Sequence, residues 1–212
     1  MIVIDKEKAM KTNQRVRRAP EQAREEILLA ATEVFSRDNA EPVTVKTIMN
    51  ETGMTRSTFY HYYSSIEEIC EGLLERMETK IKQSVDGWLD GDGGQDPKLE
   101  TENHIKAMFR IIADNAFSDR TTSEINANVP FLFREWQERI IAYFSKRTAK
   151  FIRRQVELGR SRIEDPDRIA LALLHMNSSV VTSARAHENP EEFFSMASAL
   201  AHIWNATIFD SL

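Results

Sequence analysis

The 212-residue chain contains only one cysteine, seven glycines and six prolines. A single cysteine excludes an intrachain disulfide, and such low cysteine usage is typical of a reducing compartment. No apolar run approaches the ~20 residues that a transmembrane helix needs. Residues 1–16 hold a short apolar patch followed by charged residues, which is unlike a signal peptide. We therefore expect a soluble, cytoplasmic protein with no membrane partner.

The spacings of common catalytic and metal sites are also missing. The five histidines include no H-E-x-x-H spacing, and the chain has no Gly-x-Ser-x-Gly motif. His175 and His202 could hold a metal between two helices, but a histidine hydrogen-bonded at a helix interface is more common. Cys70 lies in an apolar helical stripe, as structural thiols do. The sequence thus predicts no enzyme, no cofactor and no metal site.

Four of the seven glycines fall within residues 87–97. A phosphate-binding loop would need a preceding strand and a following Lys-Ser/Thr pair, which are absent, and the three aspartates of this segment would repel phosphate. We therefore interpret the segment as a flexible linker beyond the end of a helix near Gly87, with Trp88 folding back onto apolar surface.

Long stretches with a 3.6-residue apolar period predict an all-α fold of about nine helices. The 42% hydrophobic and 29% charged composition fits a globular protein. Two short helices are expected within residues 44–63, and residues 118–128 form a short polar segment. The other helices are expected at residues 20–38, 65–87, 99–116, 130–159, 166–186 and 190–209.

The formal net charge of −5 argues at first against a nucleic-acid partner. However, residues 1–63 carry ten Lys/Arg and nine Asp/Glu, so the remainder of the chain holds −6. A local patch decides DNA affinity rather than the whole-molecule sum. Residues 1–19 form a basic arm that could contact phosphates, although such an arm can also be a solvated tail. Its cations are Lys6, Lys8, Lys11, Arg15, Arg17 and Arg18.

Residues 44–63 predict two short helices joined by a tight turn. Thr44 and Thr55 are favourable N-cap residues, and Gly53 can adopt the positive φ of a helix stop. Phe59 and Tyr63 are four residues apart and would face inward. The side chains left for the outer surface can donate hydrogen bonds: Arg56, Ser57, Thr58, Tyr60, His61 and Tyr62. This pattern favours a helix-turn-helix that enters a DNA major groove, over a purely structural αα-corner.

The same stretch resembles the DNA-binding domain of the TetR family of bacterial transcriptional regulators. The matching residues are Thr44, Ile48, Gly53, Thr55, Thr58, Phe59, Tyr60, Tyr62 and Tyr63. The chain departs from the family pattern at Met49 and Thr52, where small alanines are usual, and at Ile66, where a phosphate-binding lysine is common. The resemblance implies a helix-turn-helix domain at residues 20–65 and a helical ligand-binding and dimerisation domain at residues 66–212.

For the DNA-facing residues, we expect a division of labour. Arg56, Tyr60 and His61 would reach bases or phosphates. The side chains expected mainly on the DNA backbone are Thr44, Thr55, Thr58 and Tyr62, with Ser57 beside them.

The second domain is rich in large apolar side chains, with Asn177 as a lone polar group among them. Apolar walls with few polar groups are typical of a small-molecule pocket, although the same residues could form a plain core. The residues expected to line the pocket are Met108, Phe109, Ile112, Phe133, Trp136, Ile140, Tyr143, Phe144, Met176, Asn177 and Trp204, with Phe117 and Phe131 as further candidates.

Two short patches, Met176-Asn177 and residues 202–204, resemble the ligand domain of the ethionamide-resistance repressor group within the TetR family. That resemblance implies an aromatic tunnel for apolar ligands and a hydrogen bond from Asn177 to the ligand. By position, Phe133, Trp136, Ile140, Phe144 and Trp204 would belong to the tunnel.

Small residues on the last two helices would allow close helix packing in a homodimer. They are Ala170, Ala172, Ser178, Ser179, Ala184, Ala197, Ala199 and Ala201, beside Leu200. The sequence thus predicts a homodimeric regulator, most often a repressor in this family, that binds a palindromic operator and is released by a small apolar effector. The alternatives are a DNA-binding protein without an effector and a helical small-molecule carrier with a vestigial helix-turn-helix.

Overall fold

The structure is a computed structural model that describes residues 19–37, 42–113, 119–183 and 189–209. These residues form an all-helical fold with no strands, which confirms the predicted fold class. The helices are α1 (Pro20–Ser36), α2 (Val45–Thr52), α3 (Arg56–Tyr62), α4 (Ile66–Asp90), α5 (Pro97–Ala113), α6 (Asp119–Asn128), α7 (Pro130–Glu157), α8 (Pro166–Ser183) and α9 (Pro190–Ile208). None of these described helices is long and apolar enough to cross a lipid bilayer.

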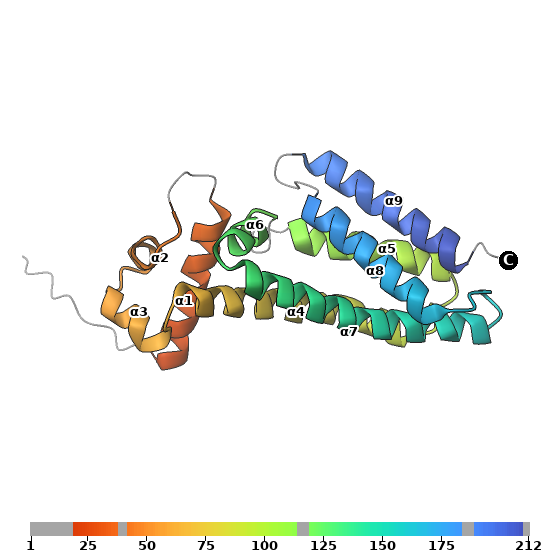
Figure 1. Cartoon of the computed structure of the whole chain (residues 1–212), viewed down its shortest axis with the longest axis horizontal. Helices are drawn as coiled ribbons and strands as arrows, with labels where there is room; N and C mark the ends of the chain where they lie inside the picture. Colours follow the sequence, from red (N-terminus) through yellow and green to blue (C-terminus); the bar gives the residue numbers. More distant parts are fainter. Residues whose placement is uncertain (1–18, 38–41, 114–118, 184–188, 210–212) are drawn as a thin grey trace, which may run out of the picture.

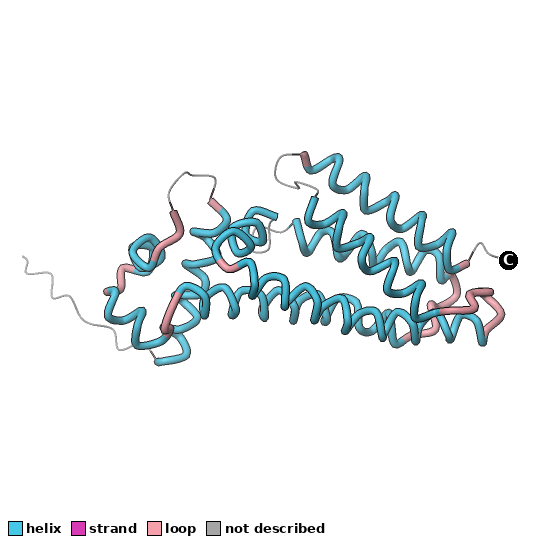
Figure 2. The backbone as a smooth tube through the Cα atoms, viewed as in Figure 1, coloured by secondary structure: helices cyan, strands magenta, loops and turns pink. Residues whose placement is uncertain are grey.

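The molecule is elongated, with α1, α2 and α3 at one end (Figure 1). Helix α4 starts beside α3 and runs into the larger bundle, where α7 lies alongside it in the same direction. With 25 residues, α4 spans roughly 37 Å at 1.5 Å per residue. Helix α5 packs against α4 and α9, α7 packs against α8, and α6 contacts α1. The loops lie mainly at the ends of the bundle (Figure 2).

The predicted caps of the short helices are confirmed. The hydroxyl of Thr44 accepts a hydrogen bond from the Thr47 amide, and the hydroxyl of Thr55 accepts one from the Thr58 amide. Gly53 ends α2 in the left-handed region, with φ of 63°. At α4, Ser65 accepts a hydrogen bond from the Glu68 amide as an N-cap should. The carboxylate of Glu68 bonds the amide and hydroxyl of Ser64.

The prediction of a flexible linker after Gly87 is wrong in part. Helix α4 continues to Asp90, and Trp88 is a buried residue of the helix itself. The following turn is held by the end of α7, because Arg154 donates to the carbonyl of Gly91 at 2.9 Å and Gln155 donates to that of Asp92 at 2.9 Å. Arg154 also bonds the carbonyl of Leu89. This loop, the α4–α5 junction, is therefore held in place by α7.

Other expected boundaries are shifted by a few residues. Helix α5 begins at Pro97, two residues earlier than expected, and the polar segment 119–128 is helical. Helices α1, α7 and α9 end one or two residues before their expected ends, and the expected end of α8 at residue 186 lies outside the described residues. Among the described residues, buried side chains from Ile27 to Phe209 form one core cluster, and the division into two domains after residue 65 stays a prediction.

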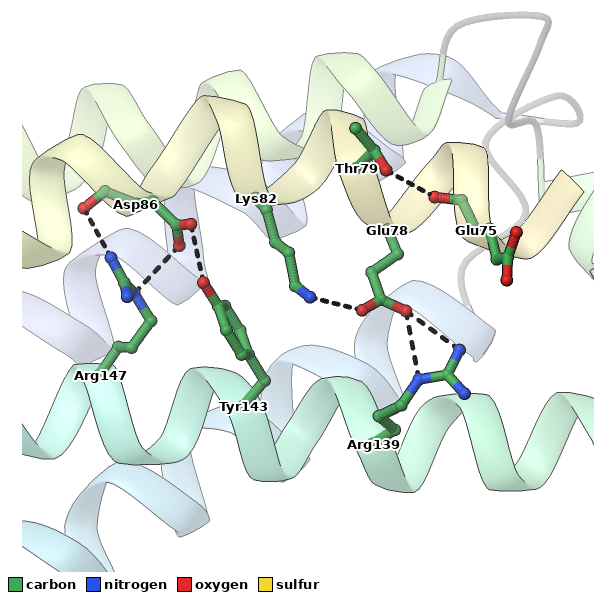
Figure 3. A network of polar contacts seen from close by, with 8 residues as sticks. All are labelled: Glu75, Glu78, Thr79, Lys82, Asp86, Arg139, Tyr143 and Arg147. Atoms are coloured by element: carbon green, nitrogen blue, oxygen red, sulfur yellow. Dashed lines mark hydrogen bonds and ion pairs between the residues drawn. The ribbon is translucent and has the colours of Figure 1, made fainter. Parts of the chain in front are cut away.

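A row of ionic and polar contacts joins α4 to α7 (Figure 3). Glu78 binds Lys82 at 2.6 Å on its own helix and Arg139 of α7 at 3.1 Å. One turn further along α7, the Tyr143 hydroxyl donates to Asp86 at 2.8 Å. Arg147 pairs with Asp86 at 3.0 Å and also with Asp90. We call these residues the α4–α7 seam: Glu78, Lys82, Asp86, Asp90, Arg139, Tyr143 and Arg147.

The seam shifts the acidity of Glu78 and Tyr143. Burial raises the pKa of Glu78, but hydrogen bonds from Lys82 and Arg139 outweigh it and hold the pKa below its ordinary 4.5. For Tyr143, burial raises the pKa, and the hydrogen bond to Asp86 raises it further. The carboxylate of Glu78 is therefore stabilised in the folded protein.

Glu78→Gln should lower the melting temperature at pH 7, because the charged partners of Glu78 lose their counterion. A carboxyl whose folded pKa is depressed stabilises the fold above its unfolded pKa, and this contribution disappears as the pH falls through the folded pKa. The melting-temperature gap to the natural protein should therefore narrow below about pH 4.5. Glu75→Gln, on the exposed side of the same helix, is the matched control. A gap that stays constant from pH 7 to pH 3 would contradict the assignment.

Two glycines with positive φ offer a matched test of the α4–α5 junction. Gly93 (φ 85°) has no room for a side chain, since a Cβ would lie 2.8 Å from the Cβ of Pro97, whereas Gly159 (φ 70°) has open space around it. Gly159→Ala should cost about 1 kcal/mol, the left-handed strain alone. Gly93→Ala should cost at least twice that, because Pro97 must also move. Equal losses in chemical denaturation would show that the junction is not tightly packed.

Candidate nucleic-acid interface and internal cavity

Helix α3 is anchored to the rest of the chain by two aromatic side chains. Phe59 and Tyr63 are buried, as the sequence predicts. The hydroxyl of Tyr63 donates to the carbonyl of Arg24 on α1 at 3.1 Å, and the guanidinium of Arg24 lies 4.4 Å from the centre of the Tyr63 ring. Arg24 also donates to the carbonyl of Tyr62 at 2.9 Å. These contacts fix the direction in which the opposite face of α3 points.

The outer face of α3 presents polar side chains to solvent. Arg56, Ser57, Tyr60 and His61 are exposed, and the Tyr60 side chain is 54% exposed despite its size. Thr58 is half-buried, because its hydroxyl lies against that of Thr55 at 3.0 Å. The surface therefore combines one cation, several hydroxyls and an imidazole on a single short helix.

Two predicted DNA-facing residues are less available than expected. Tyr62 is half-buried instead of fully exposed, because part of its side chain packs against the core. Thr44 is also half-buried, and its hydroxyl is engaged in the cap of α2. The basic arm of residues 1–18 lies outside the described residues, so its expected contacts with DNA stay a prediction.

An internal cavity of about 100 Å³ lies between α4, α5, α7 and α8. Its walls are almost entirely apolar. The predicted pocket residues that line it are Met108, Ile112, Phe133, Trp136, Ile140, Phe144 and Asn177. The sequence reasoning missed Met77, Ile81, Gln137, Ile141, Leu174, Ser178 and Val181, which complete the lining.

A second cavity of about 40 Å³ adjoins the first, and Trp204 lines it as predicted. The two cavities share five lining residues: Ile81, Met108, Phe144, Leu174 and Asn177. At the far side Trp88 stacks on His104, with ring centres 5.1 Å apart. Met77 and Ile81 lie on the apolar stripe that the 3.6-residue period forms along α4. What the stripe alone could not reveal is that part of it faces a cavity.

Four predicted pocket residues lie elsewhere. Phe109 is core, because it is fully buried and its ring packs 4.8 Å from that of Phe193. Tyr143 belongs to the α4–α7 seam, and Met176 packs against the core without lining either cavity. Phe131 is 71% exposed on the outside of α7. Phe117 lies outside the described residues.

Asn177 is buried between the two cavities. Its side-chain oxygen accepts a hydrogen bond from the indole nitrogen of Trp204 at 3.0 Å. The amide nitrogen of Asn177 has no hydrogen-bond partner among the described residues. Because Trp204 fixes which end of the amide is which, the group that remains available to a ligand is a donor.

The small residues expected at a dimer contact fall into two groups. Ala170, Ala197, Leu200 and Ala201 are buried within the chain itself, and Ser178 lines the cavity, so they do not form an outer face. Ala172, Ser179 and Ala199 are exposed, whereas Ala184 lies outside the described residues. The exposed apolar side chains beside the second group are Leu171 on α8 and Phe194 and Ile203 on α9.

The remaining chemistry-bearing residues have no arrangement that suggests catalysis. His175 and His202 are both exposed, and the described residues contain no group of three or more His, Cys, Asp or Glu side chains placed to hold a metal. Cys70 is buried, and burial raises the pKa of its thiol to about 12. Such a thiol is an inert structural residue, as the sequence predicts.

Comparison with known proteins agrees with this geometry. Residues 27–73 match the family model described as bacterial regulatory proteins, tetR family. The chain is 23% identical over 192 residues to the HTH-type transcriptional regulator EthR of Mycolicibacterium smegmatis, covering 88% of this chain and 86% of EthR. It is 27% identical over 169 residues to the HTH-type transcriptional regulator YfiR of Bacillus subtilis, covering 75% of this chain and 78% of YfiR.

Solved structures show the same fold. SmeT, the repressor of a multidrug efflux pump of Stenotrophomonas maltophilia, superposes with a TM-score of 0.66 at 23% identity, covering 86% of this chain and 88% of SmeT. GusR of Salmonella enterica superposes with a TM-score of 0.66 at 19% identity, covering 91% and 98%. Residues 27–73 thus carry the helix-turn-helix of the tetR family model, the two named relatives are transcriptional regulators rather than enzymes, and the solved structures share the fold of this chain.

Proposed function

We propose that this protein is a TetR-family transcriptional regulator that binds a palindromic operator as a homodimer. A small apolar molecule that enters the main cavity between α4, α5, α7 and α8 releases it from the operator. The observation that carries the proposal is α4 itself. One turn of this helix lines the cavity with Met77 and Ile81, and the adjoining turns hold the helix-turn-helix. Helix α4 thus contacts both the cavity and the helix-turn-helix that carries the DNA-binding face.

The DNA contact is assigned to the outer face of α3. Arg56, Tyr60 and His61 project from it and offer donors to base edges or phosphates. The neighbouring side chains would contact the sugar-phosphate backbone of the DNA: Thr44, Thr55, Ser57, Thr58 and Tyr62. Because α3 has only seven residues, two copies on neighbouring turns of the duplex are needed for selectivity.

The dimer is assigned to the outer faces of α8 and α9. Leu171, Phe194 and Ile203 are exposed there beside Ala172 and Ala199. Small residues between larger apolar ones let two helix pairs approach closely and form a four-helix interface around a two-fold axis. Such an interface would bury the apolar side chains that α8 and α9 leave exposed.

Ligand entry is coupled to DNA release through α4. The main cavity of about 100 Å³ is smaller than the ~300–1,000 Å³ of typical ligand sites, so a ligand must push its walls apart. On the DNA side, α4 is tied to α1 by the ion pairs of Arg76 with Glu25 and of Glu68 with Arg24. A displacement of Met77 therefore changes the positions of both recognition helices. Such coupling amounts to ~1–3 kcal/mol and acts equally in both directions.

The chemistry of the lining defines the effector class. The walls favour an uncharged apolar molecule, and the amide nitrogen of Asn177 favours a hydrogen-bond acceptor such as a carbonyl or ether oxygen. We expect Asn177 to contact the ligand because Met176-Asn177 and residues 202–204 resemble the ethionamide-resistance repressor group.

The operator contact is tested with Tyr60→Ala after a palindromic DNA has been selected from a random pool. Loss of a base or phosphate contact should weaken binding by about 1–3 kcal/mol, or roughly 5- to 150-fold. Gel-shift titration measures the affinity, and sedimentation checks that the dimer persists. Leu29→Ala, at an exposed apolar position on α1, is the control. Unchanged operator affinity of Tyr60→Ala would contradict the assigned face, and failure to select any palindrome would reject the function.

The cavity is tested with pairs of compounds of equal size, one a hydrocarbon and one bearing a carbonyl. A compound present at 100 times its Kd stabilises the fold by about 2.7 kcal/mol, which thermal-shift measurements detect. Asn177→Leu should abolish the preference for the carbonyl compound while leaving the hydrocarbon response in place, because it removes the donor proposed to bind the carbonyl and keeps the cavity wall apolar. Comparing shifts within each variant cancels the cost of leaving Trp204 unpaired. A carbonyl preference that survives in Asn177→Leu would exclude this amide as the recognition group.

A further inference from the structure

A groove of about 590 Å³ lies on the surface where the helix-turn-helix meets the larger bundle. It runs between the start of α4 and the turn that joins α6 to α7. Its lining residues are Ser64, Ser65, Glu67, Glu68, Glu71, Asn128, Val129, Pro130, Phe131 and Leu132. The groove is separate from both internal cavities, and neither the DNA face nor the proposed dimer face uses it.

The two walls of the groove differ in character. The α4 wall carries three carboxylates: Glu68 is engaged by Ser64 and Arg24, but Glu67 and Glu71 are exposed and form no ion pair with any described residue. The opposite wall is apolar except for Asn128, and Phe131 is 71% exposed. One cation, Arg134, lies over the Phe131 ring at 4.9 Å. A segment that fits this groove must be basic and must also carry apolar side chains.

Residues 1–18 of the same chain have this composition. They contain six Lys/Arg and two Asp/Glu, together with apolar residues at Ile2, Val3, Ile4, Met10 and Val16. The segment joins the described structure at Ala19, five residues before Arg24, whose guanidinium lies 3.4 Å from Glu68 in the groove. Eighteen extended residues reach roughly 60 Å, so the groove is well within range.

We propose that the basic arm docks in this groove when DNA is absent and exchanges from the groove to DNA phosphates when the operator is bound. Exposed ion pairs are individually weak. However, a tethered segment has a millimolar effective concentration at a nearby site, so even millimolar intrinsic affinity occupies the groove about half of the time. The exchange with DNA rests on the proposed operator binding, whereas docking itself does not.

Docking is measured without DNA on the full chain. A nitroxide is attached at Met10→Cys; Cys70 is buried with its thiol pKa raised to about 12, and so is not labelled. At low salt the label should broaden the backbone amide signals of Asn128, Val129, Phe131 and Leu132. The broadening should disappear in 0.5 M salt and in the Glu67→Gln/Glu71→Gln variant, but not in the Glu75→Gln control. Absence of broadening at low salt, or its persistence in the double variant, overturns the proposal.

The exchange is measured with the selected operator in a double-mutant cycle. Glu67→Gln/Glu71→Gln should raise operator affinity both by freeing the arm and by removing negative charge near the phosphates. Neutralising the arm (Lys6→Gln, Lys8→Gln, Lys11→Gln and Arg15→Gln) leaves only the second effect. The gain should therefore be about two- to fivefold larger with the natural arm than with the neutral arm. Equal gains would refute the exchange, while failure of every variant to bind DNA would count against the proposed function alone.

Discussion

The fixing of α4 at both ends is the constraint on which the rest of this structure depends. Near its start, Arg76 and Glu68 form ion pairs with α1, and Gly72 allows Leu28 to come so close that a Cβ there would lie 3.4 Å from it. Near its end, Asp86 and Asp90 pair with Arg147, and Arg154 satisfies carbonyl groups that the helix end leaves free. A single helix thus belongs to both regions. The proposed coupling between ligand and DNA depends on α4 transmitting a displacement from one end to the other.

The position of the cavity gives this constraint its significance. On one side of the α4–α7 helix pair, the polar contacts of the seam join the two helices (Figure 3). On the other side, Ile81 and Ile140 line the main cavity. An apolar cavity of this kind loses dispersion contacts that close packing would provide, so it weakens the fold unless a ligand fills it. The seam offsets that weakness with charged hydrogen bonds on the solvent side. In the proposed function, the seam holds the two helices together while a ligand that fills the cavity tilts them.

Features that depend on neighbouring residues could be predicted from the sequence, and features that depend on distant contacts could not. The caps at Thr44 and Thr55 and the stop at Gly53 involve partners within three or four positions, so their residue types suffice. The end of α4 was misplaced because Gly87 is a weak helix former, whereas burial of Trp88 and capping by Arg154 extend the helix. Periodicity likewise places Phe109 and Tyr143 on apolar or half-buried faces. It does not say whether such a face meets a cavity, another core residue or a charged partner.

Charge distribution follows from the need to discriminate between DNA sequences. Phosphate contacts attract every duplex equally, whereas base contacts separate the operator from all other sites. A net charge of −5, with a local excess of cations in one short arm, limits the uniform attraction to phosphates. The carboxylates of Glu67 and Glu71, which lie a few residues after the recognition helix, reduce this attraction to phosphates further. In the proposed function, this small uniform attraction lets the hydroxyls and ring nitrogens of the seven-residue α3 determine which DNA sequence the protein binds. Under the proposed operator binding, Glu67 and Glu71 therefore contribute to the selectivity of the protein.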